Sequence, residues 1–209
     1  MPTRVTFSTC VAATFLAVLP VVAQTGQVVL KSTDGGLEMT IATVRGQTVQ
    51  DAGGQLAYRV AFRGKPVLDW SNLGIAIEGA PVLGVAVHIE SSQPSSQDET
   101  WQSVAGKANP IRNHYNAVTV QTTETAASGR RLTLEARAYD DGVAFRYVVP
   151  DQPNLKDLRI TNEATQFRFP KDATTWSLIL RDFQTSSEVG WRVRAPLAGL
   201  RFPTWRRWT

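Results

Sequence analysis

The side chains able to do acid–base chemistry are few and are spread along the chain. Asp140 and Asp141 form the most conspicuous pair of carboxylates. Neighbouring residues of an extended strand point to opposite faces, whereas two cooperating carboxylates must face one substrate. The sequence Asp140-Asp141-Gly142 is instead typical of a tight hairpin turn, in which Asp-Gly adopts positive φ angles. We therefore interpret both aspartates as turn residues.

The remaining reactive residue types also favour structural roles. His88 lies in an apolar stretch, which predicts a structural histidine, and His114 lies in a polar run that is typical of a packed loop. Two histidines are too few for a histidine-based metal centre. A single cysteine, Cys10, excludes a disulfide framework and a cysteine zinc site. Because no Gly-x-Ser-x-Gly or phosphate-binding glycine loop occurs, the residues alone favour binding over catalysis.

Charge is distributed unevenly over the 209 residues, which are 43% hydrophobic and carry a net charge of +4. Residues 24–190 hold 16 basic and 18 acidic side chains. Residues 191–209 hold five arginines, no acid and three of the six tryptophans. The basic excess therefore describes this Arg/Trp-rich segment and not the body of the chain, so we expect no nucleic-acid partner.

The first 23 residues are predicted to be a cleaved signal peptide. Arg4 precedes an apolar run over residues 11–22, and Ala23 provides a small residue for cleavage before Gln24. The run is too short for a comfortable transmembrane helix, so we expect no stable membrane insertion. This pattern predicts a secreted or periplasmic protein.

Residues 24–190 read as short strands separated by turns. Apolar side chains alternate over residues 56–62, 132–136 and 143–149, with turns expected at 63–66 and 140–142. Residues 82–89 are predicted to be one strand, and the polar residues 91–97 a surface loop. No window shows a convincing helical period, so the residues predict an all-β antiparallel sandwich or barrel.

Five sequence motifs occur along the chain in a characteristic order: Asp69–Ile75, Glu99–Lys107, Ile111–Asn116, Arg137–Tyr147 and Asn162–Phe167. Over residues 27–190 the chain resembles the N-terminal domain of glycoside hydrolase family 97, exported calcium-dependent α-glucosidases and α-galactosidases of bacteria. The resemblance implies an antiparallel β-super-sandwich of the galactose-mutarotase type. It also implies that a (β/α)8 barrel, absent from this chain, holds the catalytic acid and the base or nucleophile.

The resemblance further implies one metal ligand. In the family, a glutamate in a Glu-x-x-x-Phe stretch of this domain contributes to a calcium site, and Glu163 with Phe167 matches that stretch. Calcium takes six to eight oxygen ligands, so the remaining ligands must come from another domain, and calcium is expected only in the full-length enzyme. The alternative is that Glu163 is a solvated carboxylate at a strand end.

Carbohydrate is the expected partner, and Trp101, His114 and Tyr115 are the candidate contacts, since sugar rings stack on aromatic surfaces. Trp70 and Trp176 are further aromatic candidates. The alternative is that these aromatic side chains belong to the core.

Three interpretations of the whole chain remain open at this point. The first is an inactive fragment of a glycoside hydrolase, with domain 24–190 followed by a segment, 191–209, produced by truncation or a frame shift. A native basic tail that binds a membrane or an anionic polymer is the rival account of that segment. The second is a free-standing carbohydrate-binding module. The third is a mutarotase-like enzyme, which would need Glu163 close to a histidine.

Overall fold

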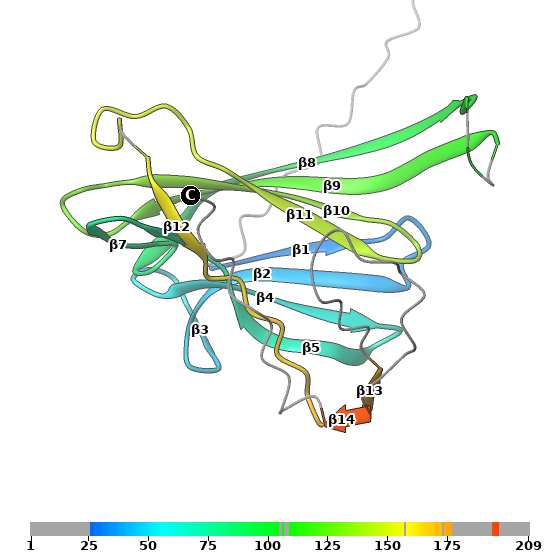
Figure 1. The fold of residues 1–209 in the computed structure, drawn as a ribbon, viewed down its shortest axis with the longest axis horizontal. Helices are drawn as coiled ribbons and strands as arrows, with labels where there is room; N and C mark the ends of the chain where they lie inside the picture. The colour runs from blue at the N-terminus through cyan, green and yellow to red at the C-terminus, as the bar shows by residue number, and fades with distance from the viewer. Residues whose placement is uncertain are drawn as a thin grey trace, which may run out of the picture.

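The computed structural model describes residues 26–104, 106, 109–156, 158–172, 174–176 and 194–196. These residues form antiparallel sheets and no helix (Figure 1), which confirms the all-β prediction. Within the described ranges no helix is long and apolar enough to cross a membrane. The predicted signal peptide and most of the Arg/Trp-rich segment lie outside the described residues.

The strands form two larger sheets and two small ones. The five-stranded sheet has the order β1-β2-β4-β5, with β3 added to β2, and comprises β1 (Gln27–Lys31), β2 (Leu37–Arg45), β3 (Thr48–Gln50), β4 (Gln55–Phe62) and β5 (Lys65–Asn72). The four-stranded sheet has the order β11-β10-β9-β8 and comprises β8 (Val87–Trp101), β9 (Ile111–Glu124), β10 (Arg131–Ala138) and β11 (Val143–Val148). The small sheets are β12-β6-β7, from β12 (Ile160–Glu163), β6 (Ile75–Ile77) and β7 (Ala80–Leu83), and the pair β13 (Thr174–Trp176) with β14 (Arg194–Pro196).

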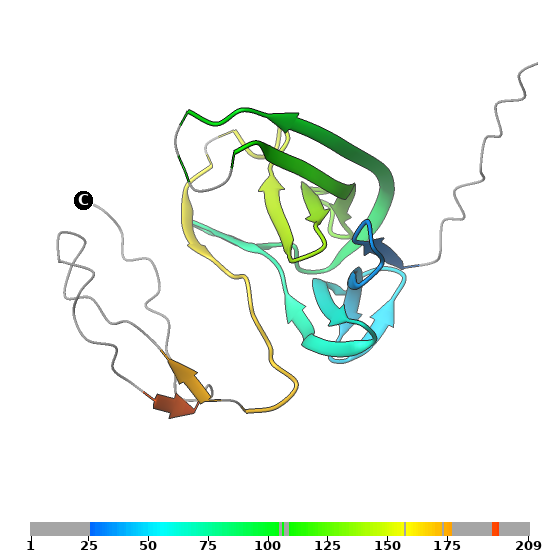
Figure 2. The same ribbon diagram turned by 90° about the vertical axis from the view of Figure 1, so that its right-hand side faces the viewer.

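The two larger sheets stack as two layers, as Figure 2 shows, and share one apolar core. Alternation along each strand places apolar side chains on the inner face, because successive residues point to opposite sides. Fully buried residues come from both layers: Met39, Ile41, Leu56 and Tyr58 from one, and Val120, Leu132 and Leu134 from the other. Each large side chain buried in this way contributes about 1.5–3 kcal/mol of transfer free energy.

Two strand predictions were wrong in instructive ways. Residues 82–89 do not form one strand, because Gly84 (φ 105°) and Ala86 (φ 52°) turn the chain between β7 and β8. Residues 91–97 are not a loop but part of β8, in register with β9. Residues 91–97 of β8 are exposed or half-buried on both faces, so they lack the apolar alternation by which a strand is recognised.

The chain turns at both predicted positions. The tight turn with positive φ angles, however, lies at the first position, and a longer loop lies at the second. Arg63 (φ 48°) and Gly64 (φ 75°) form a two-residue turn with positive φ angles between Phe62 and Lys65. Between β10 and β11 the loop has four residues, 139–142, because Ala138 pairs with Val143. Neither Asp141 nor Gly142 has a positive φ there, so the expected tight Asp-Gly turn is replaced by a longer loop.

A buried ion pair closes the loop between β9 and β10. The Arg130 guanidinium donates from Nε (2.7 Å) and Nη2 (2.6 Å) to the two carboxylate oxygens of Glu124. Both side chains are more than nine-tenths buried, at 7% and 4% exposure. Nη2 also donates to the Pro81 carbonyl, 3.0 Å away, which ties this loop to β7.

We predict that Glu124→Leu lowers the free energy of unfolding by about 3 kcal/mol, because it leaves the Arg130 charge buried without a partner. Urea denaturation followed by tryptophan fluorescence measures the change. The matched control is Glu135→Leu, which removes the partner of Arg146 from a pair of similar length whose side chains are 35% and 70% exposed. The control should cost less than about 1 kcal/mol. Equal losses in the two variants would show that burial does not set the strength of the pair.

Candidate functional site

Glu163 ends β12, at the junction of the small sheet with the two larger ones. It lies opposite Ile75 in the β6–β12 register. The next backbone groups are held along the end of β5 and its two-residue connection to β6: the Ala164 N–H donates to the Gly74 carbonyl (2.9 Å) and the Gln166 N–H to the Asn72 carbonyl (2.9 Å). Figure 2 shows the segment after β12 running beside the five-stranded layer. The backbone at Glu163 is therefore fixed by its neighbours.

The Glu163 carboxylate is exposed but is not free to rotate without loss of contacts. Its Oε1 accepts a hydrogen bond from the Thr165 hydroxyl at 2.6 Å. The Thr165 Oγ1 lies 2.7 Å from the Tyr147 hydroxyl, which also accepts the Gly74 N–H at 3.1 Å. Burial raises the pKa of the Tyr147 phenol to about 12, so this group stays protonated near neutral pH.

The Glu163 carboxylate is a suitable calcium ligand but does not make a calcium site by itself. A carboxylate oxygen is a ligand that calcium prefers, and Glu163 presents one carboxylate at the surface. Within the described ranges no group of three or more histidine, cysteine, aspartate or glutamate side chains could hold a metal ion. The carboxylates of the described residues therefore do not by themselves form a calcium site around Glu163.

The three residues predicted to contact carbohydrate do not share a face. Tyr115 and His114 are neighbours on β9, so their side chains point to opposite sides of the hairpin. The Tyr115 ring packs against Tyr139 (5.2 Å between centroids), and the Arg137 guanidinium lies 4.5 Å from the Tyr115 centroid. Trp101 lies at the end of β8 opposite Ile111 and is 45% exposed.

The other aromatic candidates differ in burial. Trp70 is 8% exposed and packs with Ala42, Val44 and Ala57, which confirms the interpretation of this residue as core. The side chain of Trp176 lies outside the described part of the structure. Among the aromatic candidates with described side chains, Trp101 is the most accessible to a ligand.

His114 belongs to a polar contact between loops, although the run that contains it is strand and not the loop expected from sequence. Its Nδ1 lies 3.4 Å from the Thr33 hydroxyl, which donates to Asp140 Oδ1 at 2.7 Å. The Asp34 N–H donates to the same oxygen at 2.9 Å. Asp140 thus links the β1–β2 turn to the β10–β11 loop, which confirms its structural interpretation.

The arrangement of the histidines does not favour a mutarotase-like centre. His88 lies opposite Thr123 and His114 opposite Asp98, at opposite ends of the β8–β9 hairpin. Nine residues of extended strand separate Thr123 from His114, roughly 30 Å. The hydrogen bond described for Glu163 comes from Thr165, not from a histidine.

The far half of the β8–β9 hairpin is held together by polar pairs. The Arg112 guanidinium donates from Nε and Nη2, both at 2.8 Å, to the two oxygens of Asp98. These hydrogen bonds from Arg112 lower the pKa of Asp98 below its ordinary value. Asn113 donates to Glu99 at 2.7 Å on the other face. Both carboxylates therefore form hydrogen bonds that join the two strands of the hairpin.

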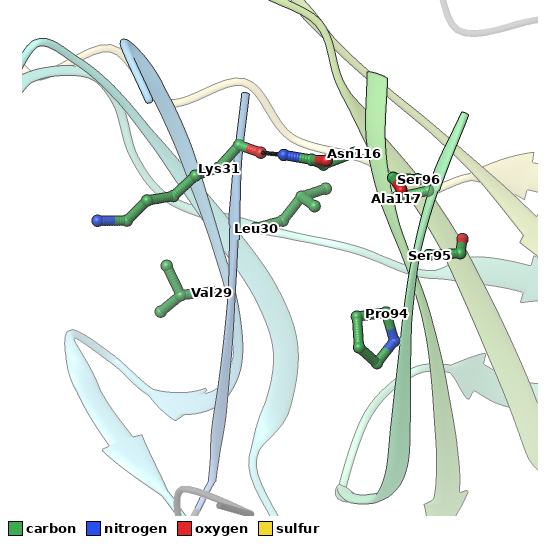
Figure 3. Close-up of a pocket in the computed structure, with 8 residues that line it drawn as sticks. All are labelled: Val29, Leu30, Lys31, Pro94, Ser95, Ser96, Asn116 and Ala117. Carbon is green, nitrogen blue, oxygen red and sulfur yellow. Dashed lines mark hydrogen bonds between the residues drawn. The ribbon is translucent and has the colours of Figure 1, made fainter. Parts of the chain in front are cut away.

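An open groove of about 610 Å³ lies between β1 and β8, the edge strands of the two larger sheets (Figure 3). Its lining residues are Val29, Leu30, Lys31, Pro94, Ser95, Ser96, Asn116 and Ala117. Asn116 bridges the gap by donating to the Lys31 carbonyl at 3.0 Å, while the Lys31 side chain points away from β8 (Figure 3). Because no ionisable side chain points into it, this groove lacks the groups needed for acid–base chemistry.

Comparison with known proteins agrees with this architecture. The chain matches the family described as glycosyl-hydrolase 97 N-terminal over residues 30–205, a range that extends past residue 190 into the Arg/Trp-rich segment. A retaining alpha-galactosidase of Bacteroides thetaiotaomicron is 30% identical over 148 residues, which are 71% of this chain and 20% of the relative. A probable retaining alpha-galactosidase of Streptomyces bingchenggensis is 32% identical over 128 residues, which are 59% of this chain and 18% of the relative.

A solved structure is also similar. A glycoside hydrolase family 97 enzyme from Pseudoalteromonas sp. strain K8, in complex with panose, superposes with a TM-score of 0.66 and 26% identity over 74% of this chain and 22% of that chain. The present chain therefore spans about a fifth of the length of the relatives that it matches.

Sequence reasoning singled out Glu163 but missed the residues around it. Gly74, Tyr147 and Thr165 each lie in one of the sequence motifs that carry the family resemblance. Their position in these motifs was the one sequence feature that could have indicated a role near Glu163. Their hydrogen-bonded contact could not be foreseen, because it depends on the pairing of strands distant in sequence.

We predict a loss of stability at alkaline pH that originates at Tyr58 and Tyr147. Burial raises the pKa of each phenol from 10 to about 12. Between these pH values the folded state retains protons that the unfolded state releases, so the free energy of unfolding falls as the pH rises from 10 to 12. Below pH 10 the two groups should contribute no pH dependence. Urea denaturation at a series of pH values measures this.

The control for this prediction is the double variant Tyr58→Phe/Tyr147→Phe, which has no phenols to titrate at these positions. Its free energy of unfolding should depend less on pH above 10 than that of the unchanged chain. An identical pH dependence in the two proteins would contradict the assignment.

Proposed function

Since the chain belongs to the glycosyl-hydrolase 97 N-terminal family, we propose that it is the non-catalytic N-terminal domain of an exported glycoside hydrolase acting on α-galactosides or α-glucosides. The observation that carries this proposal is the family match over residues 30–205 on a β-sandwich similar to a family 97 enzyme. The substrate class is supported by two relatives described as retaining alpha-galactosidases and by a similar enzyme solved with panose.

The proposed role is support of a catalytic barrel, not catalysis. Glycoside hydrolysis needs two carboxyl groups on opposite sides of the scissile bond. In this domain Asp98, Glu124 and Asp140 are engaged by Arg112, by Arg130 and by Thr33 with Asp34. We assign the catalytic carboxylates to the part of the enzyme that the relatives have beyond the matched fifth of their length.

We assign Glu163 the role of one calcium ligand at the boundary with that barrel. Its exposure, its single engaged oxygen and its fixed backbone support this assignment. Calcium, when bound, would supply positive charge that polarises groups near the scissile bond. Export through residues 1–23 is part of the same proposal and rests on the sequence pattern alone.

A free-standing carbohydrate-binding module is the second candidate, and the exposure of Trp101 is the observation that favours it. In that case the 209-residue chain should bind α-glucans without calcium, and Trp101→Ala should abolish the binding. Under the first proposal, binding of α-glucans by this chain alone should be undetectable.

We predict that the 209-residue chain alone releases no nitrophenol from 4-nitrophenyl α-galactoside or α-glucoside, because it lacks the catalytic carboxylates. Reading the genomic DNA downstream of the Glu188 codon in all three frames should identify a (β/α)8 barrel. Joined to that barrel, the chain should support calcium-dependent hydrolysis, and Glu163→Gln should raise the calcium concentration that is needed. Hydrolysis by the chain alone, or no barrel in any frame, would contradict the proposal.

A further inference from the structure

A series of hydrogen bonds leads from Gly74 through Tyr147 and Thr165 to Glu163. Only one assignment of donors and acceptors is consistent with it. The Gly74 N–H is a donor only, so the Tyr147 hydroxyl accepts from it. The single phenolic proton of Tyr147 is then directed to Thr165 Oγ1, 2.7 Å away. The Thr165 hydroxyl proton in turn points to Glu163 Oε1 at 2.6 Å. Each hydroxyl thus donates once, and an ionised carboxylate is the acceptor that completes the series.

This series connects a buried backbone group to an exposed side chain. Tyr147 and Thr165 are half-buried, whereas Glu163 is exposed. An exposed glutamate without contacts samples several rotamers and loses that freedom when it binds a cation, at an entropic cost. A hydrogen bond from a hydroxyl that is itself held in place restricts the rotamers beforehand and leaves the other carboxylate oxygen available.

We propose that Thr165 and Tyr147 are positioning residues that hold the Glu163 carboxylate in one conformation before a cation binds. The cation named here rests on the proposed function, in which Glu163 ligates calcium. Hydrogen-bonded groups behind a metal ligand commonly orient it in this way, and their loss weakens metal binding.

Gly74 links the conformation of the carboxylate to that of the backbone. Its carbonyl accepts the Ala164 N–H while its own N–H begins the hydrogen-bonded series. A Cβ at this position would lie 2.9 Å from the Leu83 carbonyl oxygen and 3.0 Å from Val82 Cγ1, so the close approach of these strands requires glycine. The same residue therefore fixes both the chain beside Glu163 and the hydroxyls behind it.

The first experiment measures the Glu163 side chain directly in the 209-residue chain without metal. Three-bond NMR couplings about χ1 of Glu163 should report a single rotamer. Thr165→Val, which removes the hydroxyl and keeps the shape, should give averaged couplings, and Thr165→Ser should restore the single rotamer. Tyr147→Phe should give partial averaging. Averaged couplings in the unchanged chain, or unchanged couplings in Thr165→Val with a native-like amide spectrum, would overturn the proposal.

The second experiment adds calcium chloride to the same variants joined to the (β/α)8 barrel, which supplies the remaining calcium ligands, with glutamate labelled with 13C at the side-chain carboxyl. Calcium should shift the Glu163 carboxyl signal, and Thr165→Val should weaken binding roughly 10-fold, with Thr165→Ser close to the unchanged chain. The amide shifts around residue 163 should be lost in Glu163→Gln. Equal calcium affinity in the unchanged chain and in Thr165→Val would overturn the positioning role.

The χ1 couplings and the calcium-induced shift of the Glu163 signal distinguish failure of the positioning role from failure of the proposed calcium ligation. If calcium leaves the Glu163 signal unchanged while the couplings respond to the Thr165 variants as expected, the positioning role stands and the assignment of Glu163 as a calcium ligand fails.

Discussion

Tyr58, Phe145 and Tyr147 pack against one another where the inner faces of the two larger sheets meet. The Tyr58 and Phe145 ring centroids are 5.2 Å apart, and those of Phe145 and Tyr147 are 6.0 Å apart. Aromatic side chains bury large apolar areas and prefer such tilted arrangements. This contact joins β4 of one layer to β11 of the other and lies at the edge of the shared apolar core.

The polar ends of the same tyrosines attach the β12 segment to the sandwich. The Tyr58 hydroxyl donates to the Gln166 carbonyl at 3.0 Å, while the Tyr147 hydroxyl lies between Gly74 and Thr165. A buried hydroxyl needs a partner, because an unpaired polar group loses its interactions with water without replacement. The core therefore determines where Glu163 lies, although Glu163 itself is exposed.

Three carboxylates of this domain form hydrogen bonds that stabilise the domain itself. The buried Glu124–Arg130 pair closes a loop, Asp98 stabilises a hairpin, and Asp140 joins two loops. The Glu163 carboxylate lies at the surface and accepts its hydrogen bond from a hydroxyl, not from a cationic side chain. In the proposed enzyme, the barrel would supply the remaining calcium ligands and the catalytic carboxylates.

The sequence by itself determined the features that depend on local chemistry. Alternating apolar residues predicted the strands of the core, and Arg63-Gly64 and Asp140–Gly142 predicted hairpin turns, because side-chain period and turn residues act over a few positions. The motifs shared with the family singled out Glu163, whose role as a calcium ligand stays a prediction. The prediction of a loop at residues 91–97 was wrong because this stretch of β8 has no buried face to impose a pattern.

Only the tertiary structure decided which distant groups meet. Gly74 and Tyr147 are 73 residues apart, and Tyr147 and Thr165 are 18 residues apart. Their hydrogen bonds depend on strand register and on the packing of one sheet upon the other, neither of which is encoded within a short window. The same packing covers Trp70, so residue type alone could not say which aromatic side chains remain accessible.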